Sequence, residues 1–190
     1  NIFREGSTVH CGTAGGGGVT KIGDDNFFMA YTHVAHDCLV GNKTIFANSA
    51  TLAGHVVVED GATIGAFSAV HQFCRVGREA HIGGYSVVTM DALPYGKTVG
   101  SRAMCRLYGV NTIGLERRGI PSSTIEQLKR AYRHLLHSKL NTTEALERID
   151  NEVGLDGSEV RYLVEFIRTS KRGVNLRRHP KQADPVGVED

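Results

Sequence analysis

The hydrophobic positions of this chain recur every six residues. Twelve positions spaced by six, from Ile22 to Val88, all carry an aliphatic residue or phenylalanine, and the residue after each is mostly small. A second set of mostly small residues follows four positions after each apolar one. Neither an α-helix nor a simple strand has this period. The pattern is typical of a hexapeptide β-helix repeat.

Each hexad predicts one short, flat face of a triangular coil, so that three hexads make one full turn. Neighbouring coils then pair as parallel strands about 4.8 Å apart, and each coil is stabilised mainly by its neighbours. We therefore expect a mainly β fold, with a parallel β-helix over residues 1–107.

Cys38 and Cys74 stand two coils apart, about 9–10 Å, which is too far for a disulfide. Both are expected to be buried packing residues.

The pattern changes in the C-terminal part of the chain. Residues 94–120 leave the six-residue register, and from Pro121 the apolar spacing becomes helical. Ser123 and Glu126 predict a capping box at the start of that helix. Two further helices are expected over 143–153 and 158–170, within a helical domain over 108–171 that is followed by a disordered tail over 172–190.

One stretch near the beginning does not fit the coil. "TAGGGG", residues 13–18, supplies no core side chain and predicts a loop extruded from the coil. Such a loop is either a flexible surface segment or a cover for a site on a neighbouring subunit. The chain starts at Asn1 within patterned sequence, so we expect further coils to precede it in the native protein.

Composition narrows the function classes only a little. The 190 residues carry a formal net charge of +2, which argues against a nucleic-acid-binding footprint. No apolar run approaches the roughly 20 residues of a membrane span. The four cysteines are irregularly spaced and predict no disulfide framework. Histidine is the unusual feature, with six of the nine falling between His10 and His81.

The three-hexad turn predicts which polar side chains stack. One column contains His36, Gly54 and Gln72, and the next contains Asp37 and His55, with His71 beside Gln72. We expect these residues to form one polar patch across three coils. Because neighbouring residues of a strand point to opposite faces, Asp37 is not expected to touch His36 in the same chain without a local bend.

Two kinds of chemistry suit this patch. Three histidines with an open position could bind zinc, although His33 and His36 are predicted to diverge. Alternatively, one histidine could act as a general base near neutral pH, with an acid to orient it. The bare backbone N–H of Gly54 could then stabilise an oxyanion. The residues alone leave both possibilities open.

Four motifs resemble one family, the UDP-N-acetylglucosamine O-acyltransferases that begin bacterial lipid A biosynthesis. They are "THVAHDCLVGN" (32–42), "ATLAGHVVV" (50–58), "AVHQFCRVG" (69–77) and "GVNTIGLERRG" (109–119), and the resemblance spans about residues 1–170. It implies a left-handed coil and a cytoplasmic homotrimer with its active sites between subunits. It also implies acyl carrier protein as the donor, UDP-N-acetylglucosamine as the acceptor, and no metal or organic cofactor. Alternatives are the sibling N-acyltransferases of 3-amino sugars, a carbonic anhydrase-like zinc trimer, and a purely structural β-helix.

The resemblance also implies residue roles. The implied catalytic residues are His36 as general base, Asp37 as the acid beside it and Gly54 as the oxyanion donor. The implied substrate-binding residues are His10, His33, His55, His71, Gln72, Gly84, Asn111 and Arg117, with Gly84 leaving room for a long acyl chain. Ile113 departs from the family, which often has an acid there. Basic residues near the coil end form either a solvated rim or a landing surface for the acidic carrier: Arg75, Arg78, Lys97, Arg102, Arg106, Arg117 and Arg118.

Overall fold

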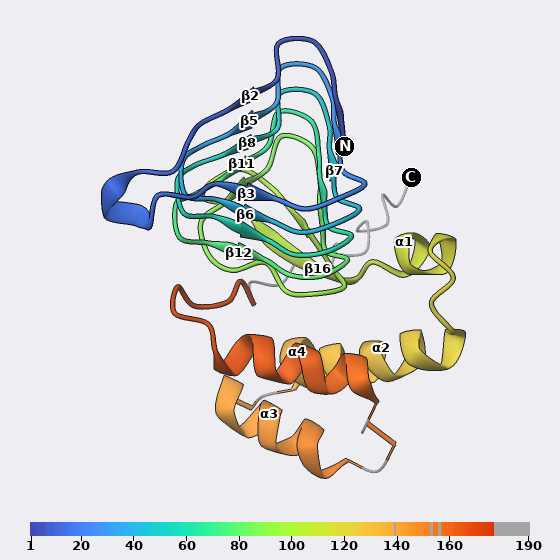
Figure 1. Ribbon diagram of the computed structural model, residues 1–190. Helices are drawn as coiled ribbons and strands as arrows, with labels where there is room; N and C mark the ends of the chain where they lie inside the picture. The colour runs from blue at the N-terminus through green and yellow to red at the C-terminus, as the bar shows by residue number, and fades with distance from the viewer. Residues whose placement is uncertain (139, 153, 156, 177–190) are drawn as a thin grey trace, which may run out of the picture.

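Three mainly parallel sheets form the walls of a triangular coil, and a group of helices packs beneath it (Figure 1). This computed structural model describes residues 1–138, 140–152, 154–155 and 157–176. Most strands of the coil are two residues long, so each face is short. Among the described residues, no helix is both long enough and apolar enough to cross a bilayer.

Each wall is one sheet of strands from successive coils. The first wall contains β1 (Ile2–Phe3), β4 (Phe27–Phe28), β7 (Ile45–Phe46), β10 (Thr63–Ile64), β13 (His81–Ile82), β15 (Gly96–Val99) and β16 (Arg106–Val110). The second contains β2 (Thr8–Val9), β5 (His33–Val34), β8 (Thr51–Leu52), β11 (Ala69–Val70) and β14 (Val87–Val88). The third contains β3 (Lys21–Ile22), β6 (Leu39–Val40), β9 (Val57–Val58) and β12 (Arg75–Val76).

The register confirms the hexapeptide coil. Thr63 pairs with His81 and Ala69 with Val87, both in parallel and both at a separation of three hexads. The second residue of each two-residue strand from β4 to β14 is buried and belongs to one core running through the coil. The left-handed sense of the coil stays a prediction.

The chain turns at each edge of the coil through a residue with left-handed backbone. These residues recur every six positions and are almost all non-glycine: Asp25, Tyr31, Asp37, Lys43, Ser49, His55, Gly61, Phe67, Phe73, Glu79 and Tyr85. Left-handed backbone is uncommon for residues other than glycine. At these edge positions the alternation of an ordinary strand does not apply. Asp37, His55 and Phe73 share the edge between the second and third walls.

The rings of Phe28 and Phe46 and two thiols lie in the interior of the coil, and the half-exposed Phe3 stacks on Phe28 at its end. The ring centroids of Phe3 and Phe28 are 4.6 Å apart and those of Phe28 and Phe46 are 4.7 Å apart, about the spacing of neighbouring coils. Cys38 and Cys74 are fully buried and free, which confirms their prediction as packing residues. Burial raises the pKa of both thiols, that of Cys74 to about 11.

The predicted loop does leave the coil. Thr8 pairs with His33, 25 residues away, whereas Lys21 pairs with Leu39 at the regular separation of three hexads. Seven extra residues therefore lie between β2 and β3, where Figure 1 shows a blue loop projecting from the edge of the coil. We call residues 10–20 the strap. It contains one short 3-10 helix, η1 (Ala14–Gly16).

Four α-helices follow the coil: α1 (Thr112–Arg117), α2 (Ser122–His137), α3 (Thr142–Asn151) and α4 (Ser158–Arg168). The predicted capping box of Ser123 and Glu126 is wrong. Helix α2 already begins at Ser122, with Pro121 before it and no side-chain cap. A capping box is instead formed in α3, between Asn141 and Glu144. Val153, the predicted end of the second helix, lies outside the described residues.

The predicted boundaries near the C-terminus differ from the structure in two places. Strand β16 (Arg106–Val110) crosses the expected domain boundary at residue 108. Residues 172–176, expected in the disordered tail, return to the coil, where Val174 forms a β-bridge with Asp91 and the N–H of Asn175 donates to the Asp91 carbonyl. This pairing holds residues 172–176 against the coil. The rest of the predicted tail, 177–190, lies outside the described residues.

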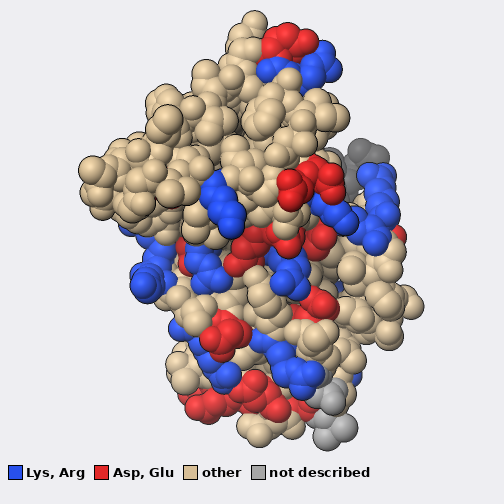
Figure 2. Space-filling view, in the orientation of Figure 1, with Lys and Arg blue, Asp and Glu red and all other residues tan. Residues whose placement is uncertain are grey.

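Arginines join the helices to the coil. The guanidinium of Arg75 lies 3.9 Å from the ring centroid of Phe166, and that of Arg78 lies 4.3 Å from that of Tyr162. Arg118 forms an ion pair with Glu79 at 2.8 Å. Figure 2 shows acidic and basic side chains intermixed over the lower part of the molecule. Three residues of the predicted basic rim therefore bind groups of their own chain.

Candidate active site

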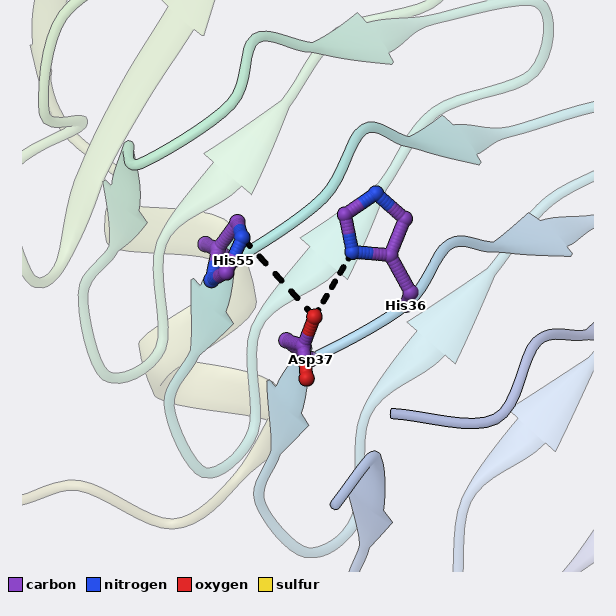
Figure 3. A group of neighbouring side chains, drawn as sticks. All are labelled: His36, Asp37 and His55. Atoms are coloured by element: carbon purple, nitrogen blue, oxygen red, sulfur yellow. Dashed lines mark hydrogen bonds and ion pairs between the residues drawn. The ribbon is translucent and has the colours of Figure 1, made fainter. Parts of the chain in front are cut away.

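His36, Asp37 and His55, from two neighbouring coils, meet at the edge between the second and third walls (Figure 3). The Asp37 carboxylate lies between the two rings, with Oδ2 at 2.7 Å from His36 Nδ1 and 3.8 Å from His55 Nε2. The two imidazoles meet edge to face, with their centroids 5.2 Å apart. The coil thus brings together the acid and two of the predicted histidines.

Asp37 touches His36 through a local bend, the condition under which the sequence allowed this contact. Without a bend, the expectation assumed the alternation of an extended strand, in which successive side chains point to opposite faces. Asp37 has a left-handed backbone, with φ of 60°. This edge geometry turns its carboxylate back toward the preceding side chain.

The Asp37 carboxylate is buried, and both of its oxygens accept hydrogen bonds. Its side chain is 1% exposed, and the strap covers it. The N–H of Thr13 donates to Oδ1 at 2.9 Å and the Thr13 hydroxyl donates to Oδ2 at 2.7 Å. The backbone N–H of Asp37 donates to the hydroxyl oxygen of Thr20 at 2.8 Å.

These contacts set the protonation of the pair. Burial raises the pKa of Asp37, but hydrogen bonds from His36 and Thr13 outweigh it and lower the pKa to about 2. Asp37 is therefore ionised at neutral pH, and an ionised carboxylate can only accept hydrogen bonds. It follows that His36 Nδ1 carries the proton that Asp37 accepts. When the ring is neutral, Nε2 keeps its lone pair.

Glycine at position 54 makes room for the His36 ring. A Cβ added to Gly54 would stand 2.6 Å from His36 Cε1 and 2.8 Å from Nε2, closer than atoms can approach. This contact confirms the predicted column of His36 and Gly54. The His36 side chain stays 40% exposed. Among the described residues, no acceptor takes the N–H of Gly54, so a donor is available beside the ring.

Phe73 belongs to this site although sequence reasoning missed it. Its ring stacks on His55 with centroids 4.6 Å apart and planes 13° apart. The two residues also line an open hollow of about 590 Å³ together with Arg75 and Arg172. Phe73 stands one turn of the coil after His55, so the spacing used for the histidines could have found it.

The polar patch does not extend as far as predicted. His71 Nδ1 lies 3.2 Å from Arg172 Nη2, which donates to it from the segment after α4. Among the contacts of the described residues, neither His71 nor Gln72 reaches the His36 group. Arg172 gave no sequence signal, because it lies 101 residues from His71 and outside the coil.

His10 and His33 form a separate pair on the second wall. Their rings meet edge to face with centroids 4.6 Å apart, and the Thr8 hydroxyl lies 2.8 Å from His33 Nδ1. Burial, together with repulsion from His10, lowers the pKa of His33. His33 therefore contacts His10 and Thr8 rather than sharing a site with His36.

The remaining predicted residues lie on other sides of the coil. Asn111 and Arg117 line a hollow of about 740 Å³ between α1 and the first wall, with Lys43 and Lys97 nearby and Ile113 exposed beside them. Gly84 stands by the edge between the first and second walls, where an added Cβ would come within 3.3 Å of the Ala66 carbonyl oxygen. Within one chain, neither place adjoins His36.

Comparison with known proteins covers both parts of the molecule. Residues 91–175 match the family described as Udp N-acetylglucosamine O-acyltransferase, domain 2, and residues 19–54 match the bacterial transferase hexapeptide family. Relatives named acyl-[acyl-carrier-protein]–UDP-N-acetylglucosamine O-acyltransferase from Anaeromyxobacter dehalogenans and Alkalilimnicola ehrlichii are 45% and 46% identical over 174 residues. Each alignment covers 92% of this chain and 66% of the relative.

Solved structures agree with this result. The UDP-N-acetylglucosamine acyltransferase of Francisella novicida superposes with a TM-score of 0.87 at 36% identity, over 100% of this chain and 69% of that one. The enzyme of that name from Campylobacter jejuni gives 0.85 at 37% identity, over 93% and 68%. This chain belongs to the UDP-N-acetylglucosamine O-acyltransferase family. It spans 66% of the length of the curated relatives named above.

The two matched regions fall on distinct parts of this acyltransferase-family chain. The hexapeptide match contains His36 and Asp37, together with Gly54 at its end. The acyltransferase match contains Asn111 and Arg117 in the hollow beside α1. The matched regions thus include these five residues, for which the resemblance implied roles.

The same histidines and acid could in principle hold a metal ion. Nitrogen and oxygen atoms of His36, Asp37 and His55 lie within 4.8 Å of one another. However, both oxygens of Asp37 already accept hydrogen bonds from Thr13, and Oδ2 also accepts one from His36. A cation bound to Oδ2 and to His36 Nδ1 would have to break the hydrogen bond between them. The contacts favour an oriented histidine over a metal ligand.

Proposed function

We propose that the full-length protein transfers a β-hydroxyacyl chain from acyl carrier protein to the 3-hydroxyl of UDP-N-acetylglucosamine, the first step of lipid A biosynthesis. The observation that carries the proposal is His36, which is held through Nδ1 by a buried carboxylate while its side chain stays partly exposed. Family membership supplies the substrates. It also supports the cytoplasm as the compartment.

The proposed reaction uses His36 as general base. Its Nε2 takes the proton of the sugar hydroxyl while that oxygen attacks the thioester carbonyl. Asp37 stabilises the imidazolium that forms, because the carboxylate is ionised and hydrogen-bonded to Nδ1. The N–H of Gly54 donates to the developing oxyanion. When the carbon–sulfur bond breaks, the imidazolium returns the proton to the departing thiolate, so that ester and thiol are the products.

The same proposal includes a homotrimer with shared sites. Arg117 and Asn111 lie by the first wall, the side of the triangle opposite the edge that holds His36. A guanidinium suits the diphosphate of a nucleotide sugar. One substrate can engage both groups if they come from neighbouring subunits. The separation of these groups within one protomer supports this arrangement.

An acyl-transfer assay on the full-length protein tests the reaction and the base together. β-Hydroxymyristoyl carrier protein and UDP-N-acetylglucosamine serve as substrates. His36→Ala should lower kcat/KM by about 10²–10⁴-fold, the usual contribution of a general base. His137→Ala, at the exposed end of α2, is the matched control and should keep wild-type turnover.

Each outcome of this assay has a distinct meaning. Near-normal turnover by His36→Ala would remove His36 as the base. If the intact wild-type protein fails with this acceptor but acylates the 3-amino sugar, the proposed acceptor is wrong and the sibling activity replaces it.

A further inference from the structure

The strap packs against Asp37 in its own chain, and Asp37 in turn binds His36. The sequence left open a flexible loop or a cover for a neighbouring subunit, and within one chain the strap binds Asp37 through Thr13. We propose that the strap sets the tautomer and orientation of His36 by clamping Asp37, with Thr13 as the positioning residue. Its effect on turnover rests on the function proposed above, whereas its effect on the histidine ring does not.

The hydroxyl of Thr13 has only one direction in which to donate. The N–H of Gly16 donates to Thr13 Oγ1 at 3.1 Å, so this oxygen also caps η1. Because a hydroxyl carries one proton, that proton goes to Asp37 Oδ2. The chain of donors therefore runs from Gly16 through Thr13 to the oxygen that also accepts from His36.

Two contacts from one residue hold both oxygens of the carboxylate. The Thr13 N–H binds Oδ1 and the Thr13 hydroxyl binds Oδ2. Rotation of the carboxylate would break at least one of these hydrogen bonds. This matters because His55 Nε2 is only 3.8 Å from the same oxygen and competes with His36 for it. The clamp keeps the shorter contact on His36.

Two neighbouring glycines of the strap provide a test variant and a matched control, because only one of them packs closely against Asp37. A Cβ on Gly16 would stand 2.2 Å from Asp37 Oδ2, whereas a Cβ on its neighbour Gly15 would meet nothing within 4 Å. Both glycines lie in η1. Gly16→Ala should therefore lift the strap from Asp37, and Gly15→Ala should leave it in place.

The consequence for His36 follows from the chemistry of imidazole. The ring nitrogen that carries the proton is decided by the hydrogen bond that the ring makes. With Asp37 clamped, Nδ1 holds the proton and Nε2 is available as the base. With the carboxylate free to turn, a fraction of the rings would hold the proton on Nε2 and could not accept another.

The first test is spectroscopic and needs no substrate. Full-length protein with ¹⁵N-labelled histidine is compared by NMR at a pH well above the ordinary pKa of imidazole. The His36 signals are assigned by their loss in His36→Ala. Wild type, Thr13→Ser and Gly15→Ala should show the proton on Nδ1, while Thr13→Val and Gly16→Ala should show a mixture of tautomers. An unchanged His36 tautomer in both Thr13→Val and Gly16→Ala would overturn the proposal.

The second test separates positioning from folding. Thr13→Val should lower kcat by about 10- to 100-fold, in the range that misplacement of a reacting group costs, with KM nearly unchanged and with activity restored in Thr13→Ser. A rise in KM alone, or failure of serine to rescue, would contradict a positioning role. If the wild type transfers no acyl group but its tautomer still depends on Thr13, the clamp stands and the proposed function fails.

Discussion

At the scale of single residues, one backbone angle decides the chemistry of the site. Asp37 would point away from His36 in an extended strand, but its left-handed φ of 60° brings the two side chains into contact. The spacing of three hexads could predict the column of His36 and Gly54. It could not predict the Asp37 contact, because the spacing describes faces and Asp37 lies at an edge. Nor could it find Thr13, which lies in a segment outside the register.

The depressed pKa of Asp37 predicts an acid-dependent contribution to stability. The fold lowers this pKa from the ordinary 3.8 to about 2. Because the ionised form is favoured in the fold, the stabilisation is complete above about pH 5 and is lost as pH falls through about 4 toward 2. Asp37→Asn should therefore be less stable than wild type at neutral pH, and the difference in unfolding free energy should narrow between about pH 5 and 2. Urea unfolding at several pH values measures it. A difference that stays constant over this range would contradict the assigned pKa.

At the scale of elements, the coil is stabilised by repetition rather than by long strands. Its walls consist mostly of two-residue strands, and the buried residue of each one packs on its counterparts in the coils above and below. Sequence periodicity predicted this arrangement almost completely, because every hexad obeys the same rule. The helices were less accurately predicted at their ends. Ser123 was expected to cap α2, but the helix already starts at Ser122, directly after Pro121.

The stack of phenylalanines along the coil predicts a large effect for substitution of one buried member, Phe46. Phe46 is fully buried and stacks on Phe28, which in turn stacks on Phe3. Phe46→Ala should lower the free energy of unfolding by about 3–5 kcal/mol, the usual cost of such a cavity. Phe46→Leu keeps most of the volume and should cost clearly less. Urea denaturation at equal protein concentration compares the two, and equal losses would show that ring packing is not the cause.

At the scale of the whole molecule, the two ends of the proposed site belong to different structural parts. His36 lies at an edge of the coil, whereas Arg117 belongs to α1, which packs over the first wall. Contacts such as Arg75 on Phe166 and Arg78 on Tyr162 fix the helices to the coil end. The two partners of each contact come from distant parts of the chain, beyond the reach of any local pattern.

Shared sites predict that two weak variants can complement each other. Full-length His36→Ala and Arg117→Ala should each have low kcat/KM as homotrimers. When the two are co-expressed, some subunit boundaries combine an intact His36 with an intact Arg117. Activity of the mixed trimers should therefore exceed that of either parent. Mixed trimers no more active than the parents would place both residues at a site within one protomer.

The strict register of the coil also limits how such a chain can vary in length. A deletion of one hexad between His36 and His55 would preserve every local repeat but would rotate all later residues by one face, so that His55 would leave the edge that holds Asp37. Insertions and deletions inside the coil are therefore compatible with the site only in whole turns. An insertion that leaves the coil as a loop also preserves the register, and the strap is an example. Its seven extra residues leave at one edge and return there, so the coils that follow keep their phase.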